Sequence, residues 1–257
     1  MKKILFLFVM AFFFAFTSSA KDWKSIKIAT EGAWPPFNEI DSDGKVKGFE
    51  VDLANAICDH LKVKCTIVTQ DWDGIIPALL AKKYDAIVAS MSITDERKET
   101  IQFSKPYYTT PARFLASKGK FSSFSNSDIV GKTVGVQKAT IHENFMNDNF
   151  KGKSTIKSYG KIEEAYLDLA AGRLDLVFAD SVTIEFGFLN TDSGKKYEMV
   201  GKSYTDEKWF GIGVGVGMRK EDKKLATMFN KAIDALYKNG EFKKLNDKYF
   251  SSYIGME

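Results

Sequence analysis

The sequence contains few of the side chains that most catalytic and metal sites require. Its 257 residues include two histidines and two cysteines. His60 and His142 have no neighbours that indicate a catalytic triad, and no spacing of metal ligands is present. The glycines of residues 211–217 alternate, without the G-x-G-x-x-G spacing of a nucleotide-binding loop. We therefore expect no cofactor, no metal and no enzyme activity.

An excess of charge of one sign is also lacking. The chain has 37 lysines and arginines against 33 aspartates and glutamates. The two signs are interspersed, without the basic stripe that nucleic-acid binding requires. We expect a small or neutral partner and no nucleic acid.

One long apolar run is present, and it lies near the N-terminus. Lys2 and Lys3 precede apolar residues 4–16, and small residues follow at 18–20. This pattern predicts a secretory signal over residues 1–20 that is cleaved from a soluble, exported protein. The alternative, an uncleaved anchor, is less favoured because the run is shorter than the ~20 residues that span a bilayer. No cysteine lies directly after the predicted cleavage point, which argues against a lipoprotein.

The two cysteines, Cys58 and Cys65, are seven positions apart. A helix-like segment leads into the first, and a strand-like segment begins at the second. In an exported protein this arrangement predicts a local disulfide between a helix end and the next strand. A zinc site is the alternative, although two thiols without convergent histidines form a poor cage.

Strand-like and helix-like segments alternate along most of the chain. Apolar residues recur at helical spacing from Phe49 to Leu61. The rhythm predicts two α/β units, each with a mainly parallel sheet covered by helices. The predicted strands are 26–29, 65–68, 86–88, 133–136, 174–178 and 212–216. One predicted helix begins at 49, and the others span 75–80, 141–150, 162–169 and 225–236.

Ligands of such sheets bind beyond the carboxyl ends of the strands. Glu31 and Trp34 follow the first strand, and Trp72 follows the second. Two tryptophans could clasp a ligand side chain and would favour a cation by ~0.5–2 kcal/mol. Alternatively, both tryptophans pack in the core.

The third strand is followed by Ser90, Ser92 and Arg97, with a predicted helix start at Thr94. Hydroxyls, free backbone N–H groups and a bidentate arginine together suit a carboxylate. Alternatively, Arg97 lies on the surface and pairs with Glu96 or another nearby acid.

The second unit offers further polar groups at its strand ends. Gln137 and Thr140 end a strand and open a helix, and Asp180 follows the strand predicted at 174–178. Asp180 could receive an ammonium group, although a turn or cap role is the common one for such a residue. The whole set suits a zwitterion with a positively charged side chain, since charges in a closed cleft must be paired.

Several segments resemble the polar amino-acid binding proteins of bacterial ABC importers, over nearly the whole mature chain. The arginine-binding and lysine/arginine/ornithine-binding members are the most similar, and the octopine- and nopaline-binding members share residues 70–74. The segments that carry the resemblance are 28–37, 48–53, 90–97, 131–136, 172–175 and 248–250.

The resemblance implies a monomeric periplasmic protein that captures a basic L-amino acid and delivers it to the membrane permease of an importer. It implies two lobes joined by a two-strand hinge, with 21–108 and 210–257 in lobe one and 109–209 in lobe two. The alternatives are another ligand, namely histidine, glutamine, octopine or nopaline, or a dehydratase on the same fold.

Carried over by position, Arg97 would bind the ligand carboxylate and Asp180 the α-amino group. Glu31 would meet the distal charge of the side chain, with Glu50 assisting. The other implied ligand-binding residues are Trp34, Trp72, Ala89, Ser90, Met91, Ser92, Gln137, Thr140, Ile141 and His142.

The sequence departs from these relatives at several of the implied positions. Ala89 stands where a serine is common, Ile141 where a threonine is common, and Trp34 is bulkier than the usual tyrosine. His142 could line the side-chain pocket or lie on the surface. These departures affect the identity of the ligand more than the family.

Overall fold

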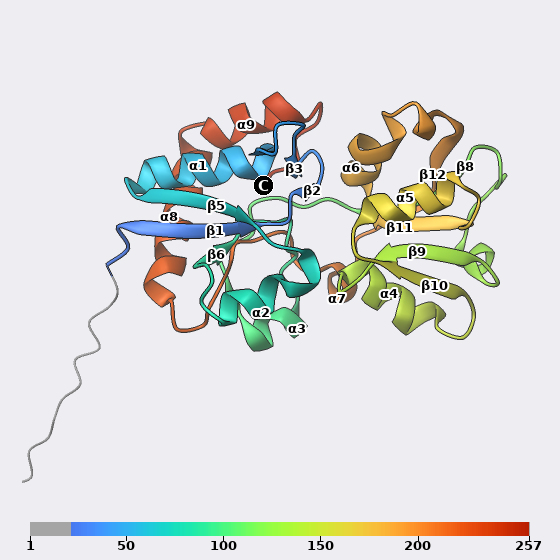
Figure 1. Cartoon of the computed structure of the whole chain (residues 1–257), viewed down its shortest axis with the longest axis horizontal. Coiled ribbons are helices and arrows are strands. Elements are labelled where there is room, and N and C mark those ends of the chain that lie inside the picture. Colours follow the sequence, from blue (N-terminus) through green and yellow to red (C-terminus); the bar gives the residue numbers. More distant parts are fainter. Residues whose placement is uncertain (1–21, 257) are drawn as a thin grey trace, which may run out of the picture.

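The computed structural model describes residues 22–256 and shows two lobes side by side (Figure 1). The predicted signal segment, 1–20, lies outside the described residues. Among residues 22–256, no helix is long and apolar enough to cross a membrane. The two-lobed α/β architecture that we predicted is confirmed.

Lobe one is built on a five-stranded sheet of order β5-β1-β6-β13-β7. Helices α1 and α9 lie on one face of it, and α2 and α3 lie on the other (Figure 1). A small sheet of β2, β3 and β4 adjoins it. The elements are β1 (Ser25–Thr30), β2 (Ala33–Trp34), β3 (Asn38–Ile40), β4 (Val46–Lys47), α1 (Phe49–Leu61), β5 (Lys64–Thr69), η1 (Trp72–Gly74), α2 (Ile75–Leu80), β6 (Ala86–Ile87), α3 (Asp95–Thr100), β7 (Gln102–Phe103), β13 (Gly217–Met218), α8 (Lys223–Lys238) and α9 (Glu241–Tyr249).

Lobe two is built on a second five-stranded sheet, of order β10-β9-β11-β8-β12. Helix α5 covers one face and α4 covers the other (Figure 1). The elements are β8 (Ala112–Ser117), η2 (Asn126–Ile129), β9 (Thr133–Gln137), α4 (Ile141–Phe150), β10 (Thr155–Tyr159), α5 (Ile162–Ala170), β11 (Leu176–Asp180), α6 (Ser181–Ile184), η3 (Glu185–Leu189), η4 (Ser193–Lys196), β12 (Tyr197–Tyr204) and α7 (Glu207–Phe210).

Each sheet is mainly parallel, with four strands that run in one direction and one that runs in the other. In lobe one, β1 pairs in parallel with β5 and β6, and β13 runs antiparallel to β6 and β7. In lobe two, β9 pairs in parallel with β10 and β11, and β8 runs antiparallel to β11 and β12. The reversed strands, β13 in lobe one and β8 in lobe two, each come directly after a connection between the lobes. They therefore enter the sheet from outside its βαβ units and run against the direction of those units.

The strand predicted at 212–216 is wrong: the strand lies at Gly217–Met218. Residues 212–216 instead form a connection, in which Val214 makes isolated bridges to Ser92 and Tyr108. The positive φ angles of Gly211 and Gly213 (74° and 121°) interrupt extended pairing there.

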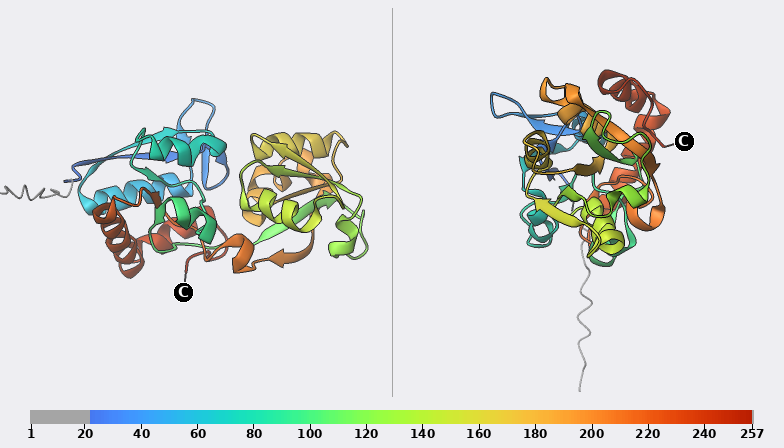
Figure 2. Two further views of the ribbon diagram at one scale, coloured as in Figure 1. Left: turned by 90° about the horizontal axis from the view of Figure 1, so that it is seen from below. Right: turned by 90° about the vertical axis from the view of Figure 1, so that its right-hand side faces the viewer.

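Two connections join the sheets, one between β7 and β8 and the other between β12 and β13. They run side by side, with the Tyr107 N–H donating to the Val214 carbonyl (2.9 Å) and the Val214 N–H to the Tyr108 carbonyl (2.8 Å). Both lie toward one side of the molecule (Figure 2). The predicted lobe boundaries, at 108/109 and 209/210, fall within these connections and stay a prediction.

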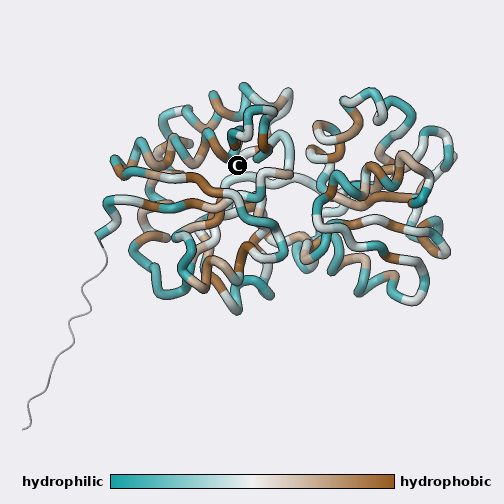
Figure 3. Tube along the Cα trace, in the orientation of Figure 1, coloured by the Kyte–Doolittle hydropathy of each residue, from teal (hydrophilic) through white to brown (hydrophobic). Residues whose placement is uncertain are grey.

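Apolar residues concentrate along the strands and on the inner faces of the helices (Figure 3). In α8, buried Leu225, Phe229 and Ile233 recur at intervals of four, the spacing of one helix face. A disulfide joins Cys58, near the end of α1, to Cys65 in β5, as predicted. It ties the helix end to the edge strand of the lobe-one sheet.

Candidate functional site

A pocket lies between the lobes and is lined by residues of both. Twelve of the fourteen predicted ligand-binding residues line it: Glu31, Trp34, Trp72, Ala89, Ser90, Ser92, Arg97, Gln137, Thr140, Ile141, His142 and Asp180. Their contacts with a ligand stay a prediction, but the fold brings them to one cavity.

Glu50 and Met91 were predicted to contact the ligand, and the structure places neither in the pocket lining. Both are completely buried. Glu50 lies in the first turn of α1 and accepts hydrogen bonds from Ser90, Tyr107 and Asn38. Met91 lies in a cluster of buried apolar residues around α2. The backbone turns at Ser90, where φ is 52°. As a result, the Met91 side chain lies in the core, while Ser90 and Ser92 line the pocket.

Nine lining residues were missed, because most belong to the connections between lobes. Their signal in the sequence was the predicted lobe boundary itself, since a chain that crosses between lobes must pass the cleft. They are Tyr108, Thr109, Thr110, Ala112, Thr205, Phe210, Gly211, Gly213 and Val214.

Arg97 is held at the start of α3, where the Thr94 hydroxyl caps the helix by accepting from the Arg97 N–H (3.3 Å). Its Nη1 donates to the Ser92 carbonyl (2.9 Å), and its guanidinium lies 5.3 Å from the Trp72 ring centroid. Burial lowers the pKa of Arg97 to about 10, so the side chain stays charged at neutral pH. Within residues 22–256 no carboxylate forms an ion pair with Arg97; Glu96 instead accepts from Asn144 (3.0 Å).

Asp180 ends β11 and also caps α6. Its Oδ1 accepts from the N–H groups of Val182 (2.9 Å) and Thr183 (3.1 Å), and its Oδ2 accepts from the Thr110 hydroxyl. Burial raises the pKa of Asp180 to about 6. Asp180 is therefore both the cap residue and a pocket acid, so the two interpretations of the sequence are compatible.

Glu31 lines the pocket from lobe one, whereas Asp180 lines it from lobe two. Glu31 is 7% exposed. Its Oε1 accepts from Nε2 of Gln137, across the two lobes, at 2.5 Å. Burial raises the pKa of Glu31 from its usual 4.5 to about 7, against the opposing effect of the Gln137 hydrogen bond. A cation placed beside Glu31 would restore the ionised form.

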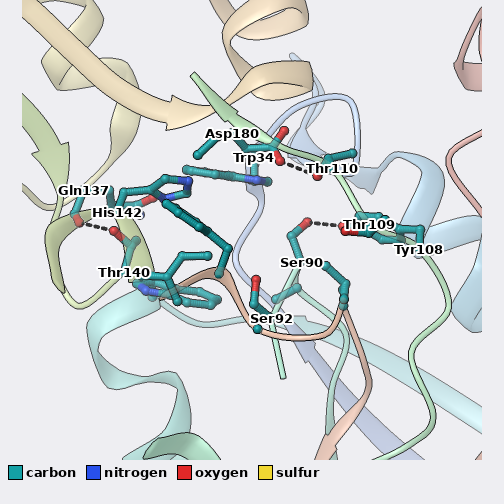
Figure 4. A pocket seen from close by; sticks show the side chains of 18 of the residues that line it. Trp34, Ser90, Ser92, Tyr108, Thr109, Thr110, Gln137, Thr140, His142 and Asp180 are labelled. Atoms are coloured by element: carbon teal, nitrogen blue, oxygen red, sulfur yellow. Dashed lines mark hydrogen bonds between the residues drawn. The ribbon is translucent and has the colours of Figure 1, made fainter. Parts of the chain in front are cut away.

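Three rings form walls of the pocket: Trp34, Trp72 and His142. Both tryptophans are buried and also line the cavity, and His142 is buried rather than on the surface. The centroid of the His142 ring lies 6.2 Å from that of Trp34. Figure 4 labels both side chains in the pocket. Burial, reinforced by the charge of Arg97, lowers the pKa of His142 to about 3, so its imidazole is neutral at neutral pH.

Helix α4 begins at the pocket. Thr140 caps it by accepting from the Glu143 N–H (3.2 Å), and its hydroxyl donates to the Gln137 carbonyl (2.7 Å; Figure 4). The first N–H groups of a helix have no partner within it, so those at Ile141 and His142 suit an anionic ligand group.

Hydrogen bonds across the cleft show that the lobes are closed on one another. Besides the bond from Gln137 to Glu31, Nε1 of Trp72 donates to the Ala139 carbonyl (3.0 Å). Lys138 pairs with Asp73 at 3.2 Å. Among the described residues, no group of three or more histidine, cysteine or acidic side chains could hold a metal ion.

The raised pKa of Glu31 predicts a pH-dependent stability. A carboxyl with a raised folded-state pKa stabilises the fold below its unfolded pKa and loses that contribution as pH rises through the folded value. The free energy of unfolding of the ligand-free wild type, relative to Glu31→Gln, should therefore fall by about 1–3 kcal/mol between about pH 4.5 and 7. Urea unfolding of both proteins across this range measures it, and a constant difference would contradict the perturbed pKa.

Comparisons with known proteins agree with this geometry. The L-arginine-binding protein of Pseudomonas aeruginosa is 47% identical over 229 residues, which cover 89% of this chain and 88% of that protein. The lysine/arginine/ornithine-binding periplasmic protein of Escherichia coli is 40% identical over 228 residues, 88% of each chain. An ancestral arginine-binding protein solved with arginine has a TM-score of 0.82 and 33% identity, over 89% of this chain and 99% of that one.

The family match extends over almost all of the described chain. The sequence pattern of the bacterial extracellular solute-binding proteins, family 3, matches residues 26–252. That span includes both sheets, both connections and every residue that lines the pocket. The chain therefore belongs to the bacterial extracellular solute-binding proteins of family 3.

Proposed function

We propose that this protein captures a basic L-amino acid, with arginine as the preferred ligand over lysine and ornithine, and delivers it to an ABC importer. The observation that carries the proposal is the charge pattern of one pocket. It contains an arginine that forms no ion pair in the described chain, and two acids, Glu31 and Asp180, whose pKa values are raised by burial. The names of the similar proteins support the same ligand class.

The backbone of the ligand is bound by opposite charges. Its carboxylate pairs with Arg97, whose planar guanidinium suits bidentate contact, and accepts from the N–H groups at the start of α4. Its α-ammonium pairs with Asp180, which is already oriented by Thr110 and by the cap of α6. Each of these charges is buried in a closed cleft, so each needs its partner.

The side chain of the ligand extends between Trp34 and Trp72 toward Glu31. A guanidinium is planar and stacks on aromatic rings, which favours arginine over lysine or ornithine in such a channel. The distal cation ionises Glu31, whose pKa is raised in the ligand-free pocket. Neutral His142 adds a ring to this wall without repelling the cation.

The remaining parts of the proposal concern the setting of the protein. The similar proteins are binding proteins, and several are named as periplasmic. We propose a cleaved signal, a periplasmic location, a membrane permease as partner, a monomeric state and no catalysis.

A thermal-shift screen tests the proposed function. The twenty amino acids, ornithine, octopine and nopaline are each added to the mature protein at equal concentration. Arginine should raise the Tm most, since a ligand at 100 times its Kd stabilises the folded state by about 2.7 kcal/mol. Stabilisation by acidic or aliphatic amino acids alone would overturn the basic-ligand assignment.

Glu31→Gln should change the selectivity of the pocket. The amide keeps the shape of the side chain but removes the charge that meets the ligand's distal cation, so arginine affinity should fall by roughly 10- to 100-fold. Affinity for glutamine should change much less. Calorimetry with both ligands measures the ratio, and Glu39→Gln, an exposed acid paired with Lys47 outside the pocket, is the matched control. Equal losses for both ligands would contradict the role of Glu31.

A further inference from the structure

The carboxylate of Glu50 is completely buried, yet it does not line the pocket. Its Oε1 accepts from the Tyr107 hydroxyl (2.7 Å), and its Oε2 accepts from Nδ2 of Asn38 (2.9 Å). The Ser90 N–H donates to both oxygens at 2.8 Å, and the Ser90 hydroxyl donates to Oε2 at 3.0 Å. Burial raises the pKa of Glu50, and these hydrogen bonds oppose that rise. A carboxylate only accepts when it is ionised, and this set of donors matches that form. Its position in the first turn of α1 also favours negative charge.

Ser90 has a backbone conformation that is rare for a residue with a side chain. Its φ is 52°, in the left-handed region where the Cβ approaches the following carbonyl oxygen. This conformation directs the chain so that Ala89, Ser90 and Ser92 line the pocket while Met91 enters the core. The hydrogen bonds from Ser90 to Glu50 offset the steric cost of the left-handed conformation, because this conformation points the Ser90 N–H at the Glu50 carboxylate.

The same carboxylate reaches two more segments around the pocket. Asn38, which donates to Glu50, also accepts from the N–H of Gly32 (2.8 Å), the residue that follows the pocket acid Glu31. Tyr107 precedes Tyr108, whose hydroxyl donates to the Ser90 hydroxyl oxygen at 2.9 Å (Figure 4). One buried acid thus connects the Glu31 loop, the Ser90 segment and the first connection between lobes.

We propose that Glu50 is a positioning residue of the binding site, which holds Ser90 in its left-handed conformation and aligns the Glu31 loop and the first connection around it. Glu50 acts through these residues and not by contact with the ligand. This inference rests on the proposed function for the choice of ligand, but the placement of Ser90 is a property of the ligand-free protein.

The first test is Glu50→Gln. Glutamine has one acceptor oxygen, and its NH2 group would face donors that now point at a carboxylate. Arginine affinity, measured by calorimetry, should fall by roughly 10- to 100-fold. The matched control is Asp175→Asn, another carboxylate that accepts a backbone N–H, from Thr133 at 3.0 Å, outside the pocket. The control should bind arginine as the wild type does; equal affinity in Glu50→Gln would overturn the proposal.

A double-mutant cycle with Ser90→Gly separates positioning from general destabilisation. Glycine adopts the left-handed conformation without steric cost, so it depends less on Glu50. Ser90→Gly alone should weaken binding by about threefold to tenfold, through the lost hydroxyl. In that background Glu50→Gln should weaken binding by less than about threefold more. Losses that multiply independently would show that Glu50 does not act through Ser90.

Amide hydrogen exchange of the ligand-free protein supplies a readout that needs no ligand. Exchange in residues 89–91 should be roughly tenfold faster in Glu50→Gln, with the outer strands of lobe two unchanged. Wild-type exchange there would overturn the proposal, even if arginine binding were lost. If the wild type binds no amino acid, the proposed function fails, while this exchange still decides the role of Glu50.

A milder variant covers the case in which Glu50→Gln does not fold. Tyr107→Phe removes one hydroxyl donor to Glu50 and keeps the buried ring, which does not line the pocket. It should weaken arginine binding by about threefold to tenfold and accelerate exchange in residues 89–91. Unchanged values of both in a folded Tyr107→Phe protein would contradict the proposal.

Discussion

Arg97→Ala should abolish the binding of every α-amino acid, with a loss of at least roughly a hundredfold to a thousandfold in affinity. Without the guanidinium, the ligand carboxylate would be buried in a closed cleft without a countercharge. Arg97→Lys should bind with intermediate affinity, because an ammonium keeps the charge but not the bidentate geometry. Calorimetry with arginine, lysine and glutamine measures the loss, which should be similar for all three.

The ligand-free stability of Arg97→Ala distinguishes a lost contact from a damaged fold. Burial lowers the pKa of Arg97 against the opposing charge of Glu96, and no acid in the described chain forms an ion pair with it. Its removal should therefore leave the Tm of the ligand-free protein within a few degrees of the wild type. Arg173→Ala, which breaks an exposed pair with Asp168 on lobe two, is the control and should bind normally. Near-normal affinity in Arg97→Ala would refute the carboxylate role.

Asp180→Asn should weaken the binding of all α-amino acids by roughly a hundredfold. The change removes the charge that pairs with the α-ammonium group. Asparagine is a good helix cap, and its Oδ1 can still accept from Val182 and Thr183, so the start of α6 should persist. Calorimetry with arginine, and with agmatine, which lacks the carboxylate but keeps the ammonium and the guanidinium group, measures the effect.

A matched control is available in the same lobe. Asp128 also accepts a backbone N–H, from Ser125 at 2.8 Å, and it lies outside the pocket. Asp128→Asn should leave affinity unchanged. If Asp180→Asn binds arginine within a few fold of the wild type, the ammonium does not pair with Asp180 and the orientation of the ligand must be reversed or different.

Much of the fold could be predicted because its signals are local. Helix α4 was predicted at its observed bounds, 141–150, directly after Thr140, which was predicted to open a helix. The disulfide was predictable because its cysteines are only seven positions apart, at a helix end and at a strand start. In contrast, β10 was missed: its residues are mostly exposed and give no alternation of apolar and polar side chains.

Two acids of lobe one show where local signals end. The resemblance assigned both Glu31, which follows β1, and Glu50, in the first turn of α1, to the ligand. Glu31 lines the pocket, whereas Glu50 is enclosed by Asn38, Ser90 and Tyr107, which come from three separate segments.

Short-range patterns in this chain are sufficient to predict several of its strands and helices, its disulfide and the clusters of polar residues at strand ends, because each depends on neighbours within a few positions. The assignment of side chains to the pocket or to the interior depended on contacts between residues far apart, such as Glu50 with Ser90 and Tyr108 with Val214. Burial and hydrogen bonding act on the folded arrangement, so only the assembled lobes select which carboxylate is left for a ligand.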